Sequence, residues 1–216
     1  MTKPKLTIKL HPIKLVQVRL GIRGIGGMIQ HRISEETLGS LEPPKPGEPK
    51  RKPKGVRNPA KETEDAKYRT FEGKPGILAM GLKKSLIEIA HKDTGVPRAQ
   101  LMKAMYIVCN DPKGVIPFTN DPSYRGRTDP VSTGGGKPGG KKTLTYRPEY
   151  TGWKATVDIR IDYDVVNEAD ICNLINRAGF GAGMGDWRPS LGGEHGRYEL
   201  DPDVPLAISE VIPGAA

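Results

Sequence analysis

Residues 154–200 read KATVDIRIDYDVVNEADICNLINRAGFGAGMGDWRPSLGGEHGRYEL, and this stretch decides the fold. Its first part, residues 154–166, alternates between apolar and polar side chains, which predicts a strand with one buried face. The residues expected to point inward are Ala155, Val157, Ile159 and Ile161.

The middle of this stretch predicts a helix that leads back to a further strand. Asn167 can cap the helix, and Glu168 and Asp170 suit its first turn because acidic side chains are favoured at a helix N-terminus. Gly179 is expected to end the helix as its C′ residue. After a glycine-rich run, HGRYEL (195–200) resumes as a strand. The residues expected to form the apolar stripe of the helix are Ile171, Leu174, Ile175 and Ala178.

The upstream chain supplies the remaining elements of one small domain. Residues 5–22 alternate like a strand, residues 76–92 carry leucines at helical spacing, and residues 105–109 are a short apolar run. The resulting order is strand, helix, strand, strand, helix, strand. It predicts an α+β fold of the ferredoxin-like (RRM-like) βαββαβ type, with one antiparallel sheet and two helices on one of its faces.

Two segments between these elements look irregular, and we interpret them as long insertions into a single domain of residues 1–216. Residues 42–75 are basic and rich in proline, which predicts an extended basic arm, a disordered insertion or a solvated linker. Residues 111–152 contain STGGGKPGGKK and predict a second, glycine-rich and mobile insertion. Residues 201–216 form a tail that can add one edge strand.

The charge and the cysteines indicate the compartment and the class of partner. The chain of 216 residues carries a formal net charge of +9, which favours a polyanionic partner. No stretch approaches the ~20 apolar residues of a membrane span, so we expect no membrane partner. Cys109 and Cys172 lie in apolar patterns and predict buried thiols in a reducing compartment. We therefore expect a cytoplasmic protein, in the host cytoplasm if a phage encodes it.

The glycine-rich run does not match the known nucleotide-binding motifs. Its glycines follow a helix, whereas a dinucleotide-binding fingerprint follows a strand, and no Walker motif is present, so no cofactor is predicted. The glycines at 21–27 (GIRGIGG) can also approach a ligand closely. What remains in the run is a mobile loop whose exposed N–H groups and Arg188 suit phosphates, with Trp187 as a stacking surface. Alternatively, Trp187 only covers a sheet edge and Asp186 pairs with Arg188.

Catalytic and metal-binding patterns are weak. None of the four histidines has another histidine at helical spacing, which argues against a zinc site, and no nucleophile motif occurs. We predict no catalytic residue and no metal site. His31 or His195 could still serve as a general acid or base in RNA cleavage.

The pattern of helix, glycine-rich loop and HGRYEL resembles the C-terminal signature of the RAMP (repeat-associated mysterious protein) superfamily. PGILAMGLKKSL resembles the first-helix signature of that superfamily, and GDWRP (185–189) resembles an element of uncharacterised phage-encoded proteins. The matching positions of the helix signature are Pro75, Gly76, Leu82 and Lys83. The resemblance implies an RNA-recognition-like domain similar to backbone subunits of CRISPR surveillance complexes. Such subunits polymerise along a guide RNA, and a thumb-like insertion reaches over the next subunit. The resemblance therefore implies such a role for the insertions 42–75 and 111–152, with other complex subunits as further partners.

The leading hypothesis from the sequence is a non-enzymatic protein that binds single-stranded RNA or DNA and self-associates along it into a homo-oligomer or filament. One alternative is a structural or assembly protein of phage virion type whose arms lace subunits together. The other is a metal-independent RAMP endoribonuclease. The residues predicted to contact nucleic acid are Arg19, Arg23, Lys83, Lys84, Trp187, Arg188 and Arg197.

Overall fold

The structure is a computed structural model that describes residues 13–41, 56–94, 97–133 and 141–211. These residues form helices and antiparallel sheets, so the predicted α+β class is confirmed. In the described part of the chain, no helix is both long enough and apolar enough to cross a bilayer.

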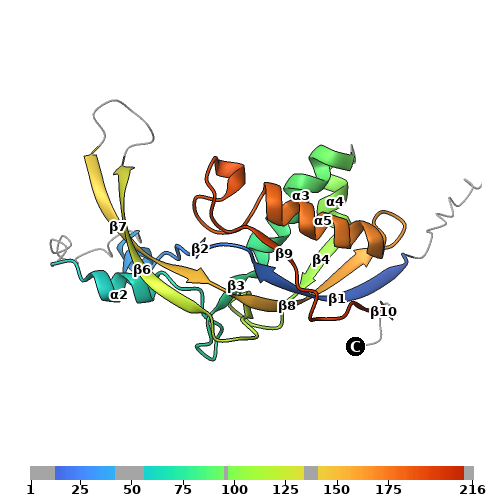
Figure 1. The fold of residues 1–216 in the computed structure, drawn as a ribbon, viewed down its shortest axis with the longest axis horizontal. Coiled ribbons are helices and arrows are strands. Elements are labelled where there is room, and N and C mark those ends of the chain that lie inside the picture. Colours follow the sequence, from blue (N-terminus) through green and yellow to red (C-terminus); the bar gives the residue numbers. More distant parts are fainter. Residues whose placement is uncertain (1–12, 42–55, 95–96, 134–140, 212–216) are drawn as a thin grey trace, which may run out of the picture.

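The main sheet has the strand order β10–β1–β8–β4, with β9 also paired to β1, and every pairing is antiparallel. Its strands are β1 (Leu15–Gly24), β4 (Met105–Val108), β8 (Lys154–Asp162), β9 (Tyr198–Leu200) and β10 (Ala207–Val211). Figure 1 shows the helices α3 (Ala79–Thr94), α4 (Arg98–Ala104) and α5 (Glu168–Gly181) on one side of this sheet. None of the helices in the described residues lies on the opposite face of the sheet, which we call the open face (Figure 1).

The core lies between the main sheet and its helices because both central strands alternate. On β8, the four residues predicted to point inward are all buried, which confirms that prediction. Leu82 and Leu86 of α3 and Ile171 and Ile175 of α5 pack onto these residues and are equally buried. The buried residues of β1 are Val16, Val18, Leu20 and Ile22.

The start of α5 matches its prediction, but its end does not. The side chain of Asn167 accepts a hydrogen bond from the N–H of Asp170 at 2.9 Å, and the Asp170 carboxylate accepts one from the Asn167 N–H. Helix α5 then continues through Gly179 to Gly181. A Cβ at position 179 would collide with the backbone carbonyl of Tyr198, so this glycine allows α5 to pack closely on β9. The first residue after α5 with a positive φ is Gly183, at +68°.

The prediction of an irregular segment over 111–152 is wrong. This segment contains a hairpin of two eleven-residue strands, β6 (Ser123–Thr133) and β7 (Lys141–Thr151). The hairpin forms a second sheet of order β2–β7–β6 with β2 (Met28–Ile29), and it extends away from the main sheet (Figure 1). A further strand, β5 (Val115–Pro117), pairs with β3 (Gly76–Leu78).

The segment 42–75 is also only partly irregular, and its residues 42–55 lie outside the described residues. Helix α2 (Pro59–Asp65) begins after the N-cap Asn58 and packs against β7, while α1 (Glu35–Leu41), of the same length, precedes the segment. Thr63, Ala66, Lys67 and Thr70 are buried, so this part of the predicted arm belongs to the folded body.

The two ends of the described chain meet in the main sheet. Residues 5–12 of the predicted first strand lie outside the described residues, and β1 continues past residue 22 to Gly24. The predicted edge strand in the tail is present as β10, which pairs with β1 at one border of the sheet.

Candidate functional site

The glycine-rich segment after α5 is folded tightly onto the protein, so the prediction of a mobile loop with exposed N–H groups is wrong. The N–H of Met184 donates to the Gly196 carbonyl at 2.9 Å, and the Gly196 N–H donates to the Gly27 carbonyl at 2.8 Å. The Asp186 N–H likewise donates to the Ile29 carbonyl at 2.9 Å. Residues 189–191 form a short 3₁₀ helix, η1 (Pro189–Leu191). The glycines of the segment with positive φ are Gly183, Gly185, Gly192 and Gly196.

The glycines bring the chain close to itself. A Cβ on Gly196 would collide with the Met184 carbonyl, and a Cβ on Gly193 would collide with the Trp187 carbonyl. Upstream, a Cβ on Gly24 would overlap the buried indole of Trp153, whereas a Cβ on Gly26 would meet no atom within 4 Å. At Gly24, Gly193 and Gly196 the missing side chain thus allows the chain to pack on itself, and close approach of the glycines to a ligand stays a prediction.

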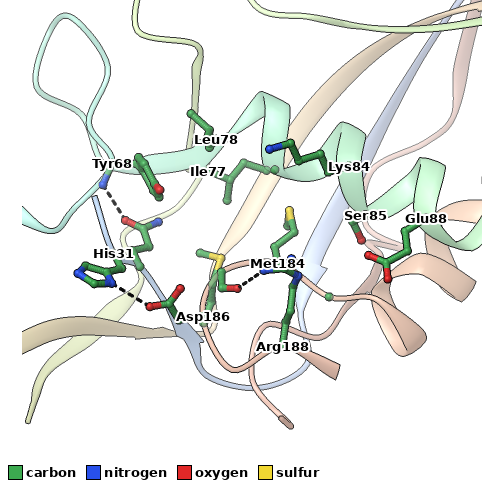
Figure 2. Close-up of a pocket in the computed structure, with 15 residues that line it drawn as sticks. His31, Tyr68, Ile77, Leu78, Lys84, Ser85, Glu88, Met184, Asp186 and Arg188 are labelled. Carbon is green, nitrogen blue, oxygen red and sulfur yellow. Dashed lines mark hydrogen bonds and ion pairs between the residues drawn. The ribbon is translucent and has the colours of Figure 1, made fainter. Parts of the chain in front are cut away.

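The folded segment forms one wall of a cavity of about 230 Å³, and α3 forms the facing wall. Lys84 and Glu88 line it from α3, and Arg188 lines it from the loop (Figure 2). Arg188 is held in place because its Nε donates to Ser190 Oγ at 2.9 Å and its Nη1 donates to the Gly185 carbonyl at 3.1 Å. The structure thus brings together two predicted contact residues, Lys84 and Arg188, from opposite walls.

The inner surface of this cavity is apolar. Met28, Ile77 and Met184 line it, and each side chain is at most 4% exposed. The hydroxyl of Ser85, which is also buried, lies next to them and contacts Tyr198 Oη at 3.0 Å. The cavity therefore combines a hydrophobic interior with a charged rim, as small-molecule and nucleobase sites do.

A second cavity, of about 350 Å³, adjoins the first and shares Glu88 and Arg188 with it. Arg98 of α4 and His91 of α3 line the second cavity. The α3 residues that line the two cavities run from Gly81 to His91, a rise of about 15 Å along a helix. We call the two cavities together the α3 groove.

At the other end of the α3 groove, Asp186 joins the loop to the hairpin. His31 Nδ1 lies 3.1 Å from Asp186 Oδ2, and Arg147 Nη1 donates to the same oxygen at 2.7 Å. Burial opposes ionisation of Asp186, but the hydrogen bonds from His31 and Arg147 outweigh it and lower the pKa of this carboxyl. Asp186 therefore does not pair with Arg188, and this alternative from the sequence is wrong.

Behind Asp186 lies a cluster of charges on the hairpin, which we call the hairpin network. Arg147, at 3% exposure, also donates to Asp129 at 2.7 Å, and Arg127 donates to Asp129 at 2.8 Å. Glu149 accepts from Arg125 at 2.9 Å. Burial opposes ionisation of both carboxyls, yet the neighbouring guanidinium groups outweigh it and lower the pKa of Asp129 and of Glu149.

Trp187 covers the hairpin network. The centre of its ring lies 4.7 Å from the Arg127 guanidinium carbon and 4.9 Å from that of Arg147, a cation–π arrangement. The indole is 38% exposed, and its backbone has a positive φ of 52°, which is uncommon for a tryptophan. Its proposed stacking on a base stays a prediction.

The remaining predicted contact residues are not gathered around the α3 groove. Arg19 and Arg23 lie on β1, where they pair with Asp158 and Glu199. Lys83 is half-buried and does not line either cavity.

Arg197 also has its own partners outside the cavities. Its guanidinium pairs with Glu194 at 2.7 Å, donates to the Phe180 carbonyl and lies over the Phe180 ring. These contacts give it a local structural role beside α5.

Sequence reasoning missed several groups that line the α3 groove. Glu88 and His91 follow Lys84 at helical spacing, so the helical periodicity could have placed all three on one side of α3. Arg98 and Met28 have no such signal because only the tertiary fold brings α4 and β2 to this helix. In the described residues, no group of three or more His, Cys, Asp or Glu side chains could hold a metal ion.

Comparisons with known proteins give limited similarity. No family model and no curated protein matches this chain. Among solved structures, one similar chain belongs to the cryo-EM structure of the type III-B Cmr-beta complex bound to cognate target RNA. That chain is 13% identical with a TM-score of 0.47, and the match covers 91% of this chain and 61% of that chain. This chain thus spans less than two thirds of the length of that neighbour.

Proposed function

We propose that this protein is a non-catalytic single-stranded nucleic-acid-binding protein and that the strand lies in the α3 groove. The observation that carries the proposal is the pair of adjoining cavities with Lys84 and Arg188 on facing walls. A backbone passing between these two cations would place its phosphates within reach of both.

The distribution of charge favours the α3 groove over the open face. The groove carries the cations Lys84, Arg98 and Arg188 and the carboxylates Glu88 and Asp186, and Asp186 already binds Arg147. On the open face, Arg19, Arg23 and Lys154 have carboxylate partners, while Arg160 donates to the side chain of Gln17. Because cationic surfaces attract phosphates in proportion to their net charge, the groove is the better site.

The size and lining of the groove favour a single strand. Its cavities of about 230 and 350 Å³ are too small for a duplex, and the first cavity offers an apolar interior that an unpaired base can enter. Single-strand binders generally combine a positive channel with apolar or aromatic base contacts.

The order and direction of the strands in the main sheet support assigning it as a ferredoxin-like, RAMP-like unit. The sequence β1, α3, β4, β8, α5, β9 follows the βαββαβ order, and the sheet order β9–β1–β8–β4 is antiparallel throughout. The proposal includes self-association along the ligand, which the extended hairpin supports as a surface for a neighbouring subunit or another complex subunit (Figure 1).

The test is binding of fluorescently labelled single-stranded RNA and DNA of about 12 nucleotides, followed by anisotropy at several salt concentrations. Three phosphate contacts, from Lys84, Arg98 and Arg188, predict a slope of log affinity against log salt of about −2. Lys84→Glu should weaken binding at least about 10-fold and lower the slope by about 0.7.

Lys113→Glu is the matched control because Lys113 is exposed in a turn outside both cavities. It makes the same change in charge and should leave the slope unchanged. Undetectable binding of both RNA and DNA at low salt would refute the proposed function. Size-exclusion chromatography with the 260/280 nm absorbance ratio separates a nucleic-acid-bound oligomer from an empty assembly, the outcome that a structural protein predicts.

One observation favours a second candidate function, a metal-independent ribonuclease. His31 lines the first cavity, and its contact with Asp186 orients the imidazole as in a general base. This function requires RNA cleavage that persists in EDTA and disappears in His31→Ala. Intact RNA after prolonged incubation would leave binding as the function.

A further inference from the structure

We propose that the main sheet continues from one copy of the protein into the next, with β10 of one copy paired to β4 of a second copy. The inference rests on the proposed function, because it names the surface through which the protein self-associates along a nucleic acid. It concerns the two borders of the main sheet and the end of α4.

Each border of the main sheet has a strand with a free edge in the described part of the chain. At one border β4 pairs only with β8, and at the other border β10 pairs only with β1. The outward N–H and C=O groups of such a strand can form hydrogen bonds with a strand of another chain. Because the two free edges lie at opposite borders, every copy offers one of each.

The sequences of β4 and β10 lack the features that usually protect a sheet edge, which are proline, charged side chains or a covering element. The strand β6, at a border of the second sheet, carries Pro130, Arg125 and Arg127. By contrast, β4 reads MYIV, and β10 reads AISEV with Glu210 as its one charged residue. The borders of the main sheet are therefore the ones suited to pairing with another copy.

The directions of the strands allow successive copies to have the same orientation. Every pairing in the order β10–β1–β8–β4 is antiparallel, so β4 and β10 run in opposite directions. A second copy in the same orientation therefore places its β10 antiparallel to β4. Each copy adds four strands, which is about 19 Å at the usual spacing between strands. The helices of all copies stay on one side of the extended sheet, and so do their α3 grooves (Figure 1).

Apolar side chains at the two borders can form one continuous layer. Ile208 of β10 is paired with the core residue Val18, so it faces the side of the helices, yet it remains 49% exposed. Ile107 of β4 is paired with the core residue Ile159 and faces the same side. Pairing Ile208 with Ile107 of the second copy keeps both on that side and extends the core. Met102 of α4, which is 49% exposed and directly precedes β4 by sequence, adds apolar surface at this border.

Charged side chains near the two borders are complementary. In the register that pairs Ile208 with Ile107, Glu210 lies opposite Met105, the first residue of β4. Lys103 lies two residues before Met105, in the last turn of α4. Glu210 and Lys103 are both exposed, and neither has an ion-pair partner among the described residues. Since opposite charges across an interface select the partner and the register, this pair favours β10–β4 contact over β10–β10 or β4–β4 contact.

The short length of the contact predicts when the copies assemble. The strands β4 and β10 have four and five residues, so their pairing alone buries less surface than a stable interface does. A nucleic acid that holds two copies side by side raises their effective concentration. The sheet contact therefore makes binding to a long nucleic acid cooperative.

The experiment compares binding of the full chain to oligouridine of about 12 and about 60 nucleotides by anisotropy. We expect cooperative binding to the longer oligonucleotide. Glu210→Lys and Lys103→Glu each place like charges at the contact, and each should lower the ratio of the long-strand to the short-strand affinity at least about 10-fold. An equal mixture of the two variants should restore cooperative binding, because every contact between unlike copies then joins opposite charges.

A second pair of variants tests the apolar part of the contact. Ile208→Lys should lower the same affinity ratio, whereas Ile33→Lys should leave it unchanged. The two isoleucines are matched, at 49% and 52% exposure, and Ile33 lies outside the main sheet.

The outcomes separate this inference from the proposed function. Cooperativity that persists in Glu210→Lys and Lys103→Glu, or a loss that the mixture does not restore, overturns the sheet contact and leaves nucleic-acid binding intact. Non-cooperative binding of the wild type also overturns it, and cooperativity gained on deleting residues 1–12 would identify that segment as the occupant of a border. Failure of both oligonucleotides to bind overturns the proposed function together with the inference.

Discussion

At the scale of single residues, Arg147 has more influence on the site than its sequence context suggests. It is 3% exposed, and it joins Asp186 in the glycine-rich segment to Asp129 in the hairpin. Its Nε is buried without a hydrogen-bond partner among the described residues, a cost that the two ion pairs offset. Because Asp186 also contacts His31, Arg147 indirectly sets the polar end of the α3 groove.

Replacing Arg147 should therefore lower the free energy of unfolding. Arg147→Met leaves Asp129 and Asp186 partly buried without this partner, and removing one member of a buried pair typically costs about 3–5 kcal/mol. Urea unfolding at neutral pH measures the loss in free energy of unfolding. Arg160→Met is the control because Arg160 is exposed on the open face, and its loss should change stability by less than about 0.5 kcal/mol. Equal effects of the two variants would contradict the assigned role.

At the scale of elements, the packing of α5 on the main sheet depends on the position of glycine within the helix. Gly179 lies under the backbone of β9, whereas Gly181 faces only the flexible end of Ile89. The two glycines are two positions apart in the same helix, yet only the first allows close packing of α5 on the sheet.

This difference predicts opposite results for two similar substitutions. Gly179→Ala forces α5 away from β9 and should lower the free energy of unfolding by about 1–3 kcal/mol, as overpacking does. Gly181→Ala gains helix propensity of up to about 1 kcal/mol and meets one movable methyl group, so it should be near neutral or stabilising. Thermal unfolding of both variants checks the pair, and a stable Gly179→Ala protein would show that the close approach is not required.

Comparison of β8 and α5 with the hairpin shows which elements could be predicted from the sequence. The strand over 154–162, its inward residues and the cap at Asn167 could be predicted because local periodicity and capping chemistry determine them. The hairpin was missed although Leu144, Tyr146 and Tyr150 alternate with polar residues along β7. Pro148 and the glycine-rich run before β7 favour a loop. The ion pairs that bury Arg147 and Glu149 come from β6 and do not show in the sequence.

Only part of the candidate site could be predicted, because the sequence shows the charged residues but not which of them the fold brings together. Lys84 and Arg188 were found as cations near glycines, but only the fold shows that they face one another. Arg19 and Arg23 carry the same charge and were equally plausible from the sequence. Their carboxylate partners come from β8 and β9, which are distant in sequence, so the neutralisation of these arginines was not visible.

At the scale of the whole molecule, the hairpin and the main body are joined by the hairpin network. Asp129 and Glu149 belong to the hairpin, and Asp186 belongs to the segment that lines the α3 groove. These carboxyls all have a lowered pKa because their guanidinium and histidine partners outweigh the effect of burial. Protonating them removes the attraction that holds the two parts together.

The direction of the pKa changes predicts acid sensitivity of the whole fold. A carboxyl whose pKa is lower in the folded state contributes stability above its unfolded value, about 4, and that contribution is lost as the pH falls through the folded pKa. The free energy of unfolding should therefore be constant between about pH 7 and pH 5 and then decrease below about pH 4. Asp129→Asn should lower stability at pH 7 and flatten this decrease, because one of the titrating groups is gone. Asp121→Asn, at an exposed position outside the network, should leave the pH dependence unchanged. If wild type and Asp129→Asn lose stability in parallel below pH 4, the acid sensitivity arises from other carboxyls.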